Sequence, residues 1–352
     1  MVPNVGPVRL RKLLEVFETP ERVLLARASE LRRVEGIGPE IAEAIAGWEA
    51  SVDLAGELRR IAEFGAHVIT RESPEYPRDL REIYNPPIVF YVWGTLTERD
   101  HRAVGVVGSR KTSHYGLECA KKLSYQLAYA GLTVVSGLAR GIDTAAHQGA
   151  LAAQGRTVAE IGSGLMELYP AENKGLAEKI AESGAVVSEF PMTFPPDRQT
   201  FPYRNRIVAG WGQGVLVVEA GLNSGALITA GQATDCGRQV YAVPGPIDRP
   251  TSAGSNRLIQ QGAKLVSGAD DILDDLNILV PAKPAERATP AGTDTFSDDE
   301  NAVLETLADG EKSLDDIISK SRLPTQKVSS TLLALEMKRR VKVLPGQYFA
   351  RL

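Results

Sequence analysis

Residues 104–143 decide the fold of this chain, and they read VGVVGSRKTSHYGLECAKKLSYQLAYAGLTVVSGLARGID. Two short apolar runs rich in β-branched residues, 104–107 and 133–136, enclose a helical stretch at 115–130. Runs that are apolar on both faces are typical of strands buried in a parallel sheet. Their alternation with helices predicts a doubly wound α/β domain, with a mostly parallel sheet of the Rossmann type, over residues 101–280. Its further strand-like runs are 157–161, 185–189, 215–219 and 239–243, and its further helical stretches include 144–153 and 226–236.

The first 100 residues lack this regular alternation. Residues 1–60 combine short helical patterns with two glycine turns, the second of which contains Gly36 and Gly38. A helix, a Gly-x-Gly turn and a second helix predict a helix-hairpin-helix (SAM-like) module, whose turn can hold a phosphate at a helix N-terminus. The same hairpin of helices can serve protein contacts instead, so both uses stay open. Residues 61–100 form a connector that we expect to pack on the central domain.

The C-terminal part carries a second small module. Residues 281–297 are rich in Pro, Ala and Thr without periodicity, which predicts a flexible linker. Residues 298–352 show three helical patterns and two strand-like runs around a Pro345-Gly346 turn, and this order predicts a winged helix. Its third helix suits a DNA groove or backbone, although a winged helix can also bind protein. The candidate duplex contacts are Gln326, Lys327 and Ser330.

The charge balance is nearly even, since 40 Lys and Arg stand against 44 Asp and Glu and give a net charge of −4. This excludes a uniformly basic protein but allows a locally basic groove. Cys119 and Cys236 lie in no metal-ligand spacing and the four histidines are scattered, so we expect neither a disulfide framework nor a metal site. No segment has the ~18–20 uncharged apolar residues that a membrane helix needs. We therefore expect a cytoplasmic protein that does not contact membranes.

The loops after the predicted strands lack the signatures of cofactor binding and catalysis. Residues 162–164 (GSG) lack the third glycine of a dinucleotide fingerprint, because Glu167 stands in its place, and no Walker A pattern occurs. Asp143 and His147 lie one helical turn apart, but no G-x-S-x-G elbow presents a nucleophile to them. The helix dipole and local hydrogen bonds explain these two residues more simply. We predict no cofactor and no catalytic residue.

These loops combine small, polar and basic residues instead. In a doubly wound sheet they meet at one edge, where glycines allow close approach, serines and free N–H groups bind phosphate oxygens, and arginines neutralise them. Several anion positions beside one aromatic ring fit an unpaired polynucleotide better than a small ligand, since a ring such as Phe201 can stack on a base. The candidate single-stranded DNA contacts are Gly108, Ser109, Arg110, Lys111, Gly137, Asn173, Lys174, Arg198, Phe201, Arg204, Asn205 and Arg206.

Two of these arginines have a structural alternative. Arg204 and Arg206 could form salt bridges with acids at strand ends, such as Glu189 and Glu219, and would then be withdrawn from a nucleic acid. The sequence leaves open whether one arginine or both serve this purpose.

Six motifs occur together and in order, and they carry a family resemblance. They are GSR at 108–110, SGLARGID at 136–143, YPxxN at 169–173, FPxRNRI at 201–207, SGALIT at 224–229 and VPG at 243–245. With them the chain closely resembles the DNA-processing protein DprA (Smf) family over about residues 60–275, and its two ends are similar to those of the longer members. The start at Met1 is abrupt, which would suit an N-terminal module without its first helix.

The resemblance implies an extended Rossmann domain that binds single-stranded DNA without catalytic activity. It also implies that the protein forms homodimers and loads the RecA recombinase onto incoming strands during natural transformation. It places the family's DNA-contacting arginine on Arg110, its basic residue on Arg198 and its stacking aromatic on Phe201.

Two functions of other classes stay open. Nucleotide phosphoribohydrolases are related Rossmann proteins that hold the phosphate of a nucleoside monophosphate at a Gly-rich helix start. In this chain, residues 223–229 could hold that phosphate, and Glu219 could be the carboxylate beside the sugar. A structural adaptor with an inert sheet and partner-binding end modules is the other hypothesis. Release of free base that depends on Glu219 would favour the enzyme, and a central domain without affinity for single strands would favour the adaptor.

Overall fold

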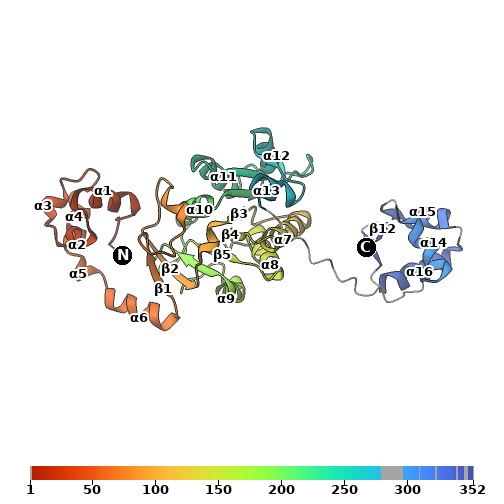
Figure 1. Cartoon of the computed structure of the whole chain (residues 1–352), viewed down its shortest axis with the longest axis horizontal. Coiled ribbons are helices and arrows are strands. Elements are labelled where there is room, and N and C mark those ends of the chain that lie inside the picture. Colours follow the sequence, from red (N-terminus) through yellow and green to blue (C-terminus); the bar gives the residue numbers. More distant parts are fainter. Residues whose placement is uncertain are drawn as a thin grey trace. The chain divides into compact units, whose positions relative to one another are not determined.

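The computed structural model describes residues 2–278, 296–308, 310–321, 323–337, 340–344 and 348–351. The chain divides into two compact units, Met1–Pro281 and Ala282–Leu352 (Figure 1). Of the linker predicted at 281–297, all but the last two positions lie outside the described residues, as does the predicted Pro345-Gly346 turn.

A sheet forms the centre of the first unit (Figure 1). It has nine strands in the order β1-β2-β6-β5-β4-β3-β7-β8-β9. The strands are β1 (His67–Thr70), β2 (Val89–Gly94), β3 (Ala103–Val107), β4 (Thr133–Ser136), β5 (Thr157–Ile161), β6 (Ala185–Ser188), β7 (Gly214–Val217), β8 (Gln239–Ala242) and β9 (Lys264–Leu265). Neighbouring strands between β6 and β9 in this order run parallel, whereas β1 and β2 are antiparallel to their neighbours. The predicted doubly wound, mostly parallel sheet is confirmed. The chain reverses its direction of winding at β3, which lies between β4 and β7.

Helices cover both faces of this sheet. They are α7 (His114–Tyr129), α8 (Ile142–Ala152), α9 (Lys174–Ser183), α10 (Thr200–Gly210), α11 (Gly225–Asp235), α12 (Ala253–Gln260) and α13 (Asp270–Asp275). Successive residues of a strand point to opposite faces of the sheet. Val134 of β4 accordingly lies in one apolar cluster with Leu127 of α7, and Val135 lies in another cluster with Ile207 of α10. Every residue of β3 to β7 is buried, which explains why these strands are mostly apolar; Glu160 of β5 is the one charged residue among them.

The N-terminal residues form short helices around an apolar cluster of their own. They are α1 (Pro7–Phe17), α2 (Pro20–Leu25), α3 (Ala28–Leu31), α4 (Pro39–Ala46) and α5 (Trp48–Ser51). The turn between α3 and α4 requires glycine at Gly36, whose φ is +84°. The Arg9 guanidinium donates a hydrogen bond of 3.2 Å to the carbonyl oxygen of Gly36. The helix-hairpin-helix expected from the sequence is therefore present.

The segment between this module and the parallel strands extends the sheet. α6 (Leu54–Phe64) begins at an Asp53 cap and crosses the boundary predicted at residue 60. β1 and β2 then add an antiparallel pair beside β6, in a register that joins Val92 to Val187. Sequence analysis predicted neither β1 nor β9. The short 3₁₀ helices of the first unit are η1 (Arg78–Arg81), η2 (Glu98–His101) and η3 (Ala171–Asn173).

The second unit has the winged-helix order of elements. It contains α14 (Asp298–Thr306), β10 (Lys312–Ser313), α15 (Leu314–Ser321), α16 (Thr325–Met337), β11 (Val341–Leu344) and β12 (Tyr348–Arg351). Its three strands pair in the order β10-β12-β11, and buried Leu304, Ile317 and Leu332 join the helices.

Candidate nucleic-acid interface

The carboxyl ends of the parallel strands carry a pocket of about 340 Å³. It lies beside the end of β3, where the winding reverses, which is the place where doubly wound sheets bind ligands. The loops after β3 and β4, the first turns of α10 and the start of α11 line it. The predicted contacts that line it are Gly108, Ser109, Arg110, Lys111, Arg204 and Asn205.

The loop after β3 presents two cations. Gly108 has no room for a side chain, since a Cβ atom there would lie 2.9 Å from the Glu219 carbonyl oxygen. The Ser109 amide donates to the same carbonyl over 2.7 Å and ties the loop to the end of β7. Arg110 and Lys111 follow with exposed side chains, and within the described residues no carboxylate pairs with either. Two unpaired cations at the mouth of a pocket favour an anionic ligand.

Aromatic rings lie next to this cation pair. The Arg110 guanidinium lies over the Phe201 ring, with Cζ 5.1 Å from its centroid, and the Tyr169 ring follows at 5.7 Å from that of Phe201. Gly162 lets Phe201 settle against the sheet edge, because a Cβ atom there would lie only 3.0 Å from the ring. Phe201 stays half-buried and Tyr169 exposed, so both rings offer surface to a ligand.

The loop after β4 passes over a buried arginine. A Cβ atom at Gly137 would lie 2.7 Å from Cζ of Arg204, so a larger residue there would have to displace the Arg204 guanidinium. Leu138 has a positive φ of 56°, and the side-chain amide of Asn173 donates to its carbonyl oxygen over 2.8 Å and to the Thr144 hydroxyl over 2.9 Å. Asn173, which the sequence analysis placed among the candidate DNA contacts, is buried and holds this loop in place.

We call the pocket and the loops around it the groove. Arg204 lies beneath this groove rather than on its surface. Its side chain is buried, and its guanidinium donates to the carbonyl oxygen of Glu160. Burial lowers the pKa of Arg204, while the nearby Glu160 and Asp143 carboxylates oppose that shift. Burial also raises the pKa of Glu160 well above its ordinary value. Arg204 therefore reaches the floor of the pocket and exposes little of its own surface to a DNA strand.

Arg206 forms one of the salt bridges considered from the sequence. Its Nη2 lies 2.8 and 2.9 Å from the two carboxylate oxygens of Glu189, and its Cζ lies 4.1 Å from the centroid of the Tyr203 ring. Both partners of this ion pair are about nine-tenths buried. The structural alternative thus holds for Arg206, whose partner is Glu189, and Glu219 pairs with neither arginine within the described residues.

The remaining candidates are accessible. Lys174 is exposed at the first position of α9, and Arg198 is exposed two residues before α10 begins. Asn205 is half-buried and lines the pocket. No carboxylate pairs with Lys174 or Arg198 among the residues that the structure describes.

Glu219 is the carboxylate that the phosphoribohydrolase hypothesis requires. In the structure it accepts hydrogen bonds from the residues just before α7. It is only 2% exposed and accepts hydrogen bonds from the Thr112 hydroxyl, the Ser113 amide (2.8 Å) and the Ser113 hydroxyl (2.8 Å). Burial acts to raise the pKa of Glu219, but these hydrogen bonds outweigh it and hold the pKa below its ordinary value. An ionised carboxylate whose oxygens are already bonded is not placed to act on a sugar.

Asp143 and His147 form local hydrogen bonds within the protein, as the sequence analysis expected. The Asp143 carboxylate accepts from the Gly137 amide (3.1 Å) and the Ala139 amide (3.4 Å), and His147 Nδ1 lies 2.7 Å from the Thr157 hydroxyl. Burial raises the pKa of Asp143 to about 6 against the effect of Arg204. Burial lowers the pKa of His147 to about 3, so this imidazole is neutral at pH 7.

This environment predicts a pH signature for Asp143. Between about pH 4 and pH 6 the folded chain binds a proton there that the unfolded chain has released, so this group's contribution to stability falls as pH rises. Asp143→Asn should remove a change on the order of 2 kcal/mol in the free energy of unfolding across that window. Urea unfolding of both proteins at each pH measures it, and two parallel curves would contradict the prediction.

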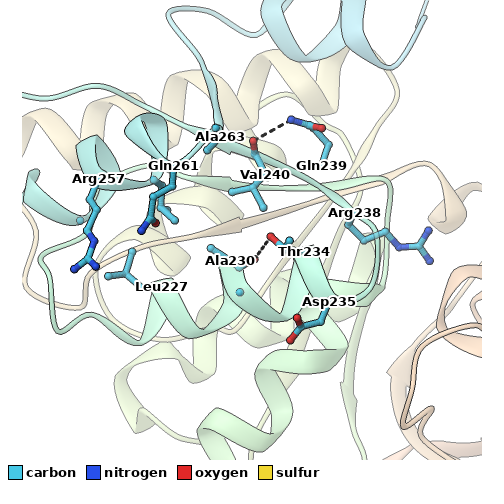
Figure 2. A pocket seen from close by; sticks show the side chains of 14 residues that line it. Leu227, Ala230, Thr234, Asp235, Arg238, Gln239, Val240, Arg257, Gln261 and Ala263 are labelled. Atoms are coloured by element: carbon cyan, nitrogen blue, oxygen red, sulfur yellow. Dashed lines mark hydrogen bonds between the residues drawn. The ribbon is translucent and has the colours of Figure 1, made fainter.

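A larger pocket, of about 650 Å³, lies on a face of the sheet between α11 and α12 (Figure 2). Leu227 and Ala230 of α11 line it together with Val240 of β8, and Arg238 and Arg257 stand at its rim. No aromatic ring is among its lining residues, and it shares no lining residue with the pocket at the carboxyl edge of the sheet. Its chemistry therefore fits the stacking of bases less well than the edge of the sheet does.

Neither a metal cluster nor a membrane helix is found in the described part of the chain. No three side chains of His, Cys, Asp or Glu gather there as ligands of a metal ion would. Within the same residues, every helix is too short or too polar to cross a bilayer.

In the second unit the predicted duplex contacts lie at the start of α16. Gln326, Lys327 and Ser330 are exposed. Lys327 forms an ion pair of 2.9 Å with Asp299 of α14, and the Ser330 hydroxyl donates to the Lys327 carbonyl oxygen. The acid partly neutralises the one cation of this set.

Family models match three parts of the chain. Residues 67–277 match the family described as DNA recombination-mediator protein A, residues 281–347 match the DprA winged helix domain, and residues 1–46 match the SAM-like helix-hairpin-helix tandem. The chain belongs to the DNA recombination-mediator protein A family. The resemblance stated from six motifs is confirmed.

Relatives of this family cover most of the chain. Protein Smf of Synechocystis sp. is 39% identical over 79% of this chain and 71% of its own length. DNA processing protein DprA of Bacillus subtilis is 36% identical over 74% of this chain and 84% of its own length. The X-ray structure of DprA from Streptococcus pneumoniae, at 36% identity, covers 77% of this chain and 94% of that chain with a TM-score of 0.69.

A second DprA structure, from Helicobacter pylori, was reported for its single-stranded DNA binding mode. It is 27% identical and covers 60% of this chain and 96% of that chain with a TM-score of 0.54.

Sequence reasoning did not select Tyr169 and Arg140 as site residues, although both stand in motifs quoted for this family. Arg140 lies with its Cζ 5.7 Å from the centroid of the Tyr169 ring, at the same edge as Phe201. Their positions in loops after β5 and β4 were visible in the sequence, but the contact between them depends on how those loops fold.

Proposed function

We propose that this chain binds single-stranded DNA, without catalysis, along the carboxyl edge of its central sheet. The observation that carries the proposal is the contact of Arg110 with the Phe201 ring, at 5.1 Å, beside a pocket that Ser109 and Lys111 line. A cation and a ring in contact supply the two things that an unpaired nucleotide needs, a partner for its phosphate and a face for its base. The single-stranded DNA binding reported for the Helicobacter pylori relative supports the same class of ligand.

Burial divides the twelve candidate residues into two groups. Arg204, Arg206 and Asn173 are buried and bonded within the protein, so we propose that they support the groove. Gly137 belongs with them, since it makes room for Arg204. The proposed contacts are Gly108, Ser109, Arg110, Lys111, Lys174, Arg198, Phe201 and Asn205.

Salt dependence tests this proposal directly. The full chain should bind an unstructured oligothymidylate more tightly than a duplex of equal length. The logarithm of its affinity should fall linearly with the logarithm of salt concentration, by about 0.7 for each phosphate neutralised. Fluorescence anisotropy across a salt series measures both quantities. Binding that is absent, or equally tight for duplex and single strand, would overturn the proposal.

A wider role rests on family membership. We propose that the chain acts in the cytoplasm as a homodimer, through its Rossmann domain, and loads RecA onto single-stranded DNA during DNA uptake and recombination. The match of residues 67–277 to a recombination-mediator family supports this role. Mass measurement in solution tests the dimer. Assembly of RecA on a single strand, with and without the chain, tests the loading, and equal rates in both cases would contradict it.

A further inference from the structure

Four side chains form an unbroken series of contacts at the carboxyl edge of the sheet. Arg110 contacts Phe201 at 5.1 Å, Phe201 contacts Tyr169 at 5.7 Å, and Tyr169 contacts Arg140 at 5.7 Å, each measured to a ring centroid. They follow β3, β4 and β5, which are neighbours in the sheet, and α10 contributes the phenyl ring. A small crevice touches all four side chains. We call this set the cation–aromatic row.

The two ends of the row differ in one respect. At one end Arg110 has no carboxylate partner within the described residues. At the other end Arg140 is held by Glu172: Nη2 donates to Oε2 over 2.8 Å, and Nε donates to Oε1. This two-point contact is the geometry with which a guanidinium also binds a phosphate. Glu172 therefore stands where a phosphate of a strand lying along the row would bind.

Both members of this ion pair remain exposed, with 52% of the Arg140 side chain and 55% of the Glu172 side chain accessible. The hydrogen bond from Arg140 holds the pKa of Glu172 below its usual range, so the acid stays ionised at neutral pH. An exposed ion pair contributes only about a two- to fivefold change in an equilibrium constant, so a phosphate can displace the carboxylate. Tyr169 would keep the released guanidinium beside the groove, through its ring and through a 3.4 Å hydrogen bond to its hydroxyl.

We propose that Glu172 is an internal competitor of the DNA backbone, which occupies Arg140 until a single strand displaces it. Arg140 and Tyr169 then complete the binding track as a second cation and a second stacking ring. This inference rests on the proposed binding of single-stranded DNA and adds to it a contact that is closed in the free protein. Its effect is selective, because a ligand that does not reach Arg140 leaves the ion pair intact and gains nothing from it.

Charge-matched variants test the competitor. Glu172→Gln should bind oligothymidylate about two- to fivefold more tightly than the wild-type chain, since Arg140 is free from the start. Its salt dependence should be steeper by about 0.7, the slope of one further phosphate. Glu178→Gln is the matched control: Glu178 is exposed on α9, is not in an ion pair within the described residues, and its loss changes the net charge equally. Affinity is measured by fluorescence anisotropy on the full chain.

A second background isolates the role of Arg140. The gain from Glu172→Gln over Glu178→Gln should vanish when both are measured together with Arg140→Ala. A gain that survives in that background, or one no larger than that of Glu178→Gln, would overturn the competitor and leave the proposed function standing. A wild-type chain without affinity for single strands would overturn both.

Discussion

Arg110→Ala should weaken the binding of single-stranded DNA by about ten- to a hundredfold. A hydrogen bond to a charged group contributes about 1.5–3 kcal/mol, and here the lost group also lies 5.1 Å from the centroid of the Phe201 ring. All base sequences should be affected alike, because the lost partner is a phosphate. Fluorescence anisotropy at several salt concentrations should also show a slope smaller by about 0.7.

The opposite end of β3 offers a control for the loss of one positive charge. Arg102 is exposed immediately before β3, at the amino edge of the sheet, whereas Arg110 follows the carboxyl end. Arg102→Ala therefore removes the same charge at the opposite edge and should leave affinity within about twofold at physiological salt, where exposed charges beyond ~8 Å are screened. Equal losses in the two variants would assign binding to net charge alone and would contradict a groove at the carboxyl edge.

Much of the central fold could be predicted because its physical signal is local. A strand buried on both faces is mostly apolar along its whole length, and the predicted runs 133–136 and 157–161 coincide with β4 and β5. β1 and β9 carry no such signal. β1 has only four residues, of which Ile69 alone is buried, and β9 has two residues, so their pairing is decided by neighbours distant in sequence.

The candidate site could be predicted less completely, because residue type does not reveal burial. Phe201, Arg204 and Arg206 lie on one helix, yet its first turn leaves Phe201 at the groove and the next turn sends both arginines inward. One signal was available in the sequence: Glu160 stands in an otherwise apolar strand, and a buried acid needs a nearby cation. Arg204 is the nearby cation: its charge opposes the rise in the pKa of Glu160, while its guanidinium donates to the Glu160 carbonyl oxygen. The contact of Arg140 with Glu172 joins the loop after β4 to η3, and nothing in the sequence of either segment indicates it.

The second large effect is expected at Arg206. Arg206→Ala leaves the nearly buried Glu189 carboxylate without its cation and should lower the free energy of unfolding by about 3–5 kcal/mol. Urea unfolding at pH 7 measures this loss. Glu189→Gln added to Arg206→Ala should recover part of it, because a neutral amide costs less to bury than a lone carboxylate. A nucleic-acid contact would behave differently, since its removal changes affinity and leaves stability nearly unaltered.

The dependence of stability on pH further distinguishes a buried ion pair from a nucleic-acid contact at Arg206. Burial already raises the pKa of Glu189, and the Arg206 guanidinium opposes that shift. Without Arg206 the pKa rises further, so the folded variant gains a proton that the unfolded chain releases at the same pH, and its deficit in stability should shrink as pH falls toward 5. The affinity of the folded variant for single strands should stay within about twofold of wild type. A tenfold loss of affinity in a variant as stable as wild type would instead place Arg206 in the groove, against its pairing with Glu189.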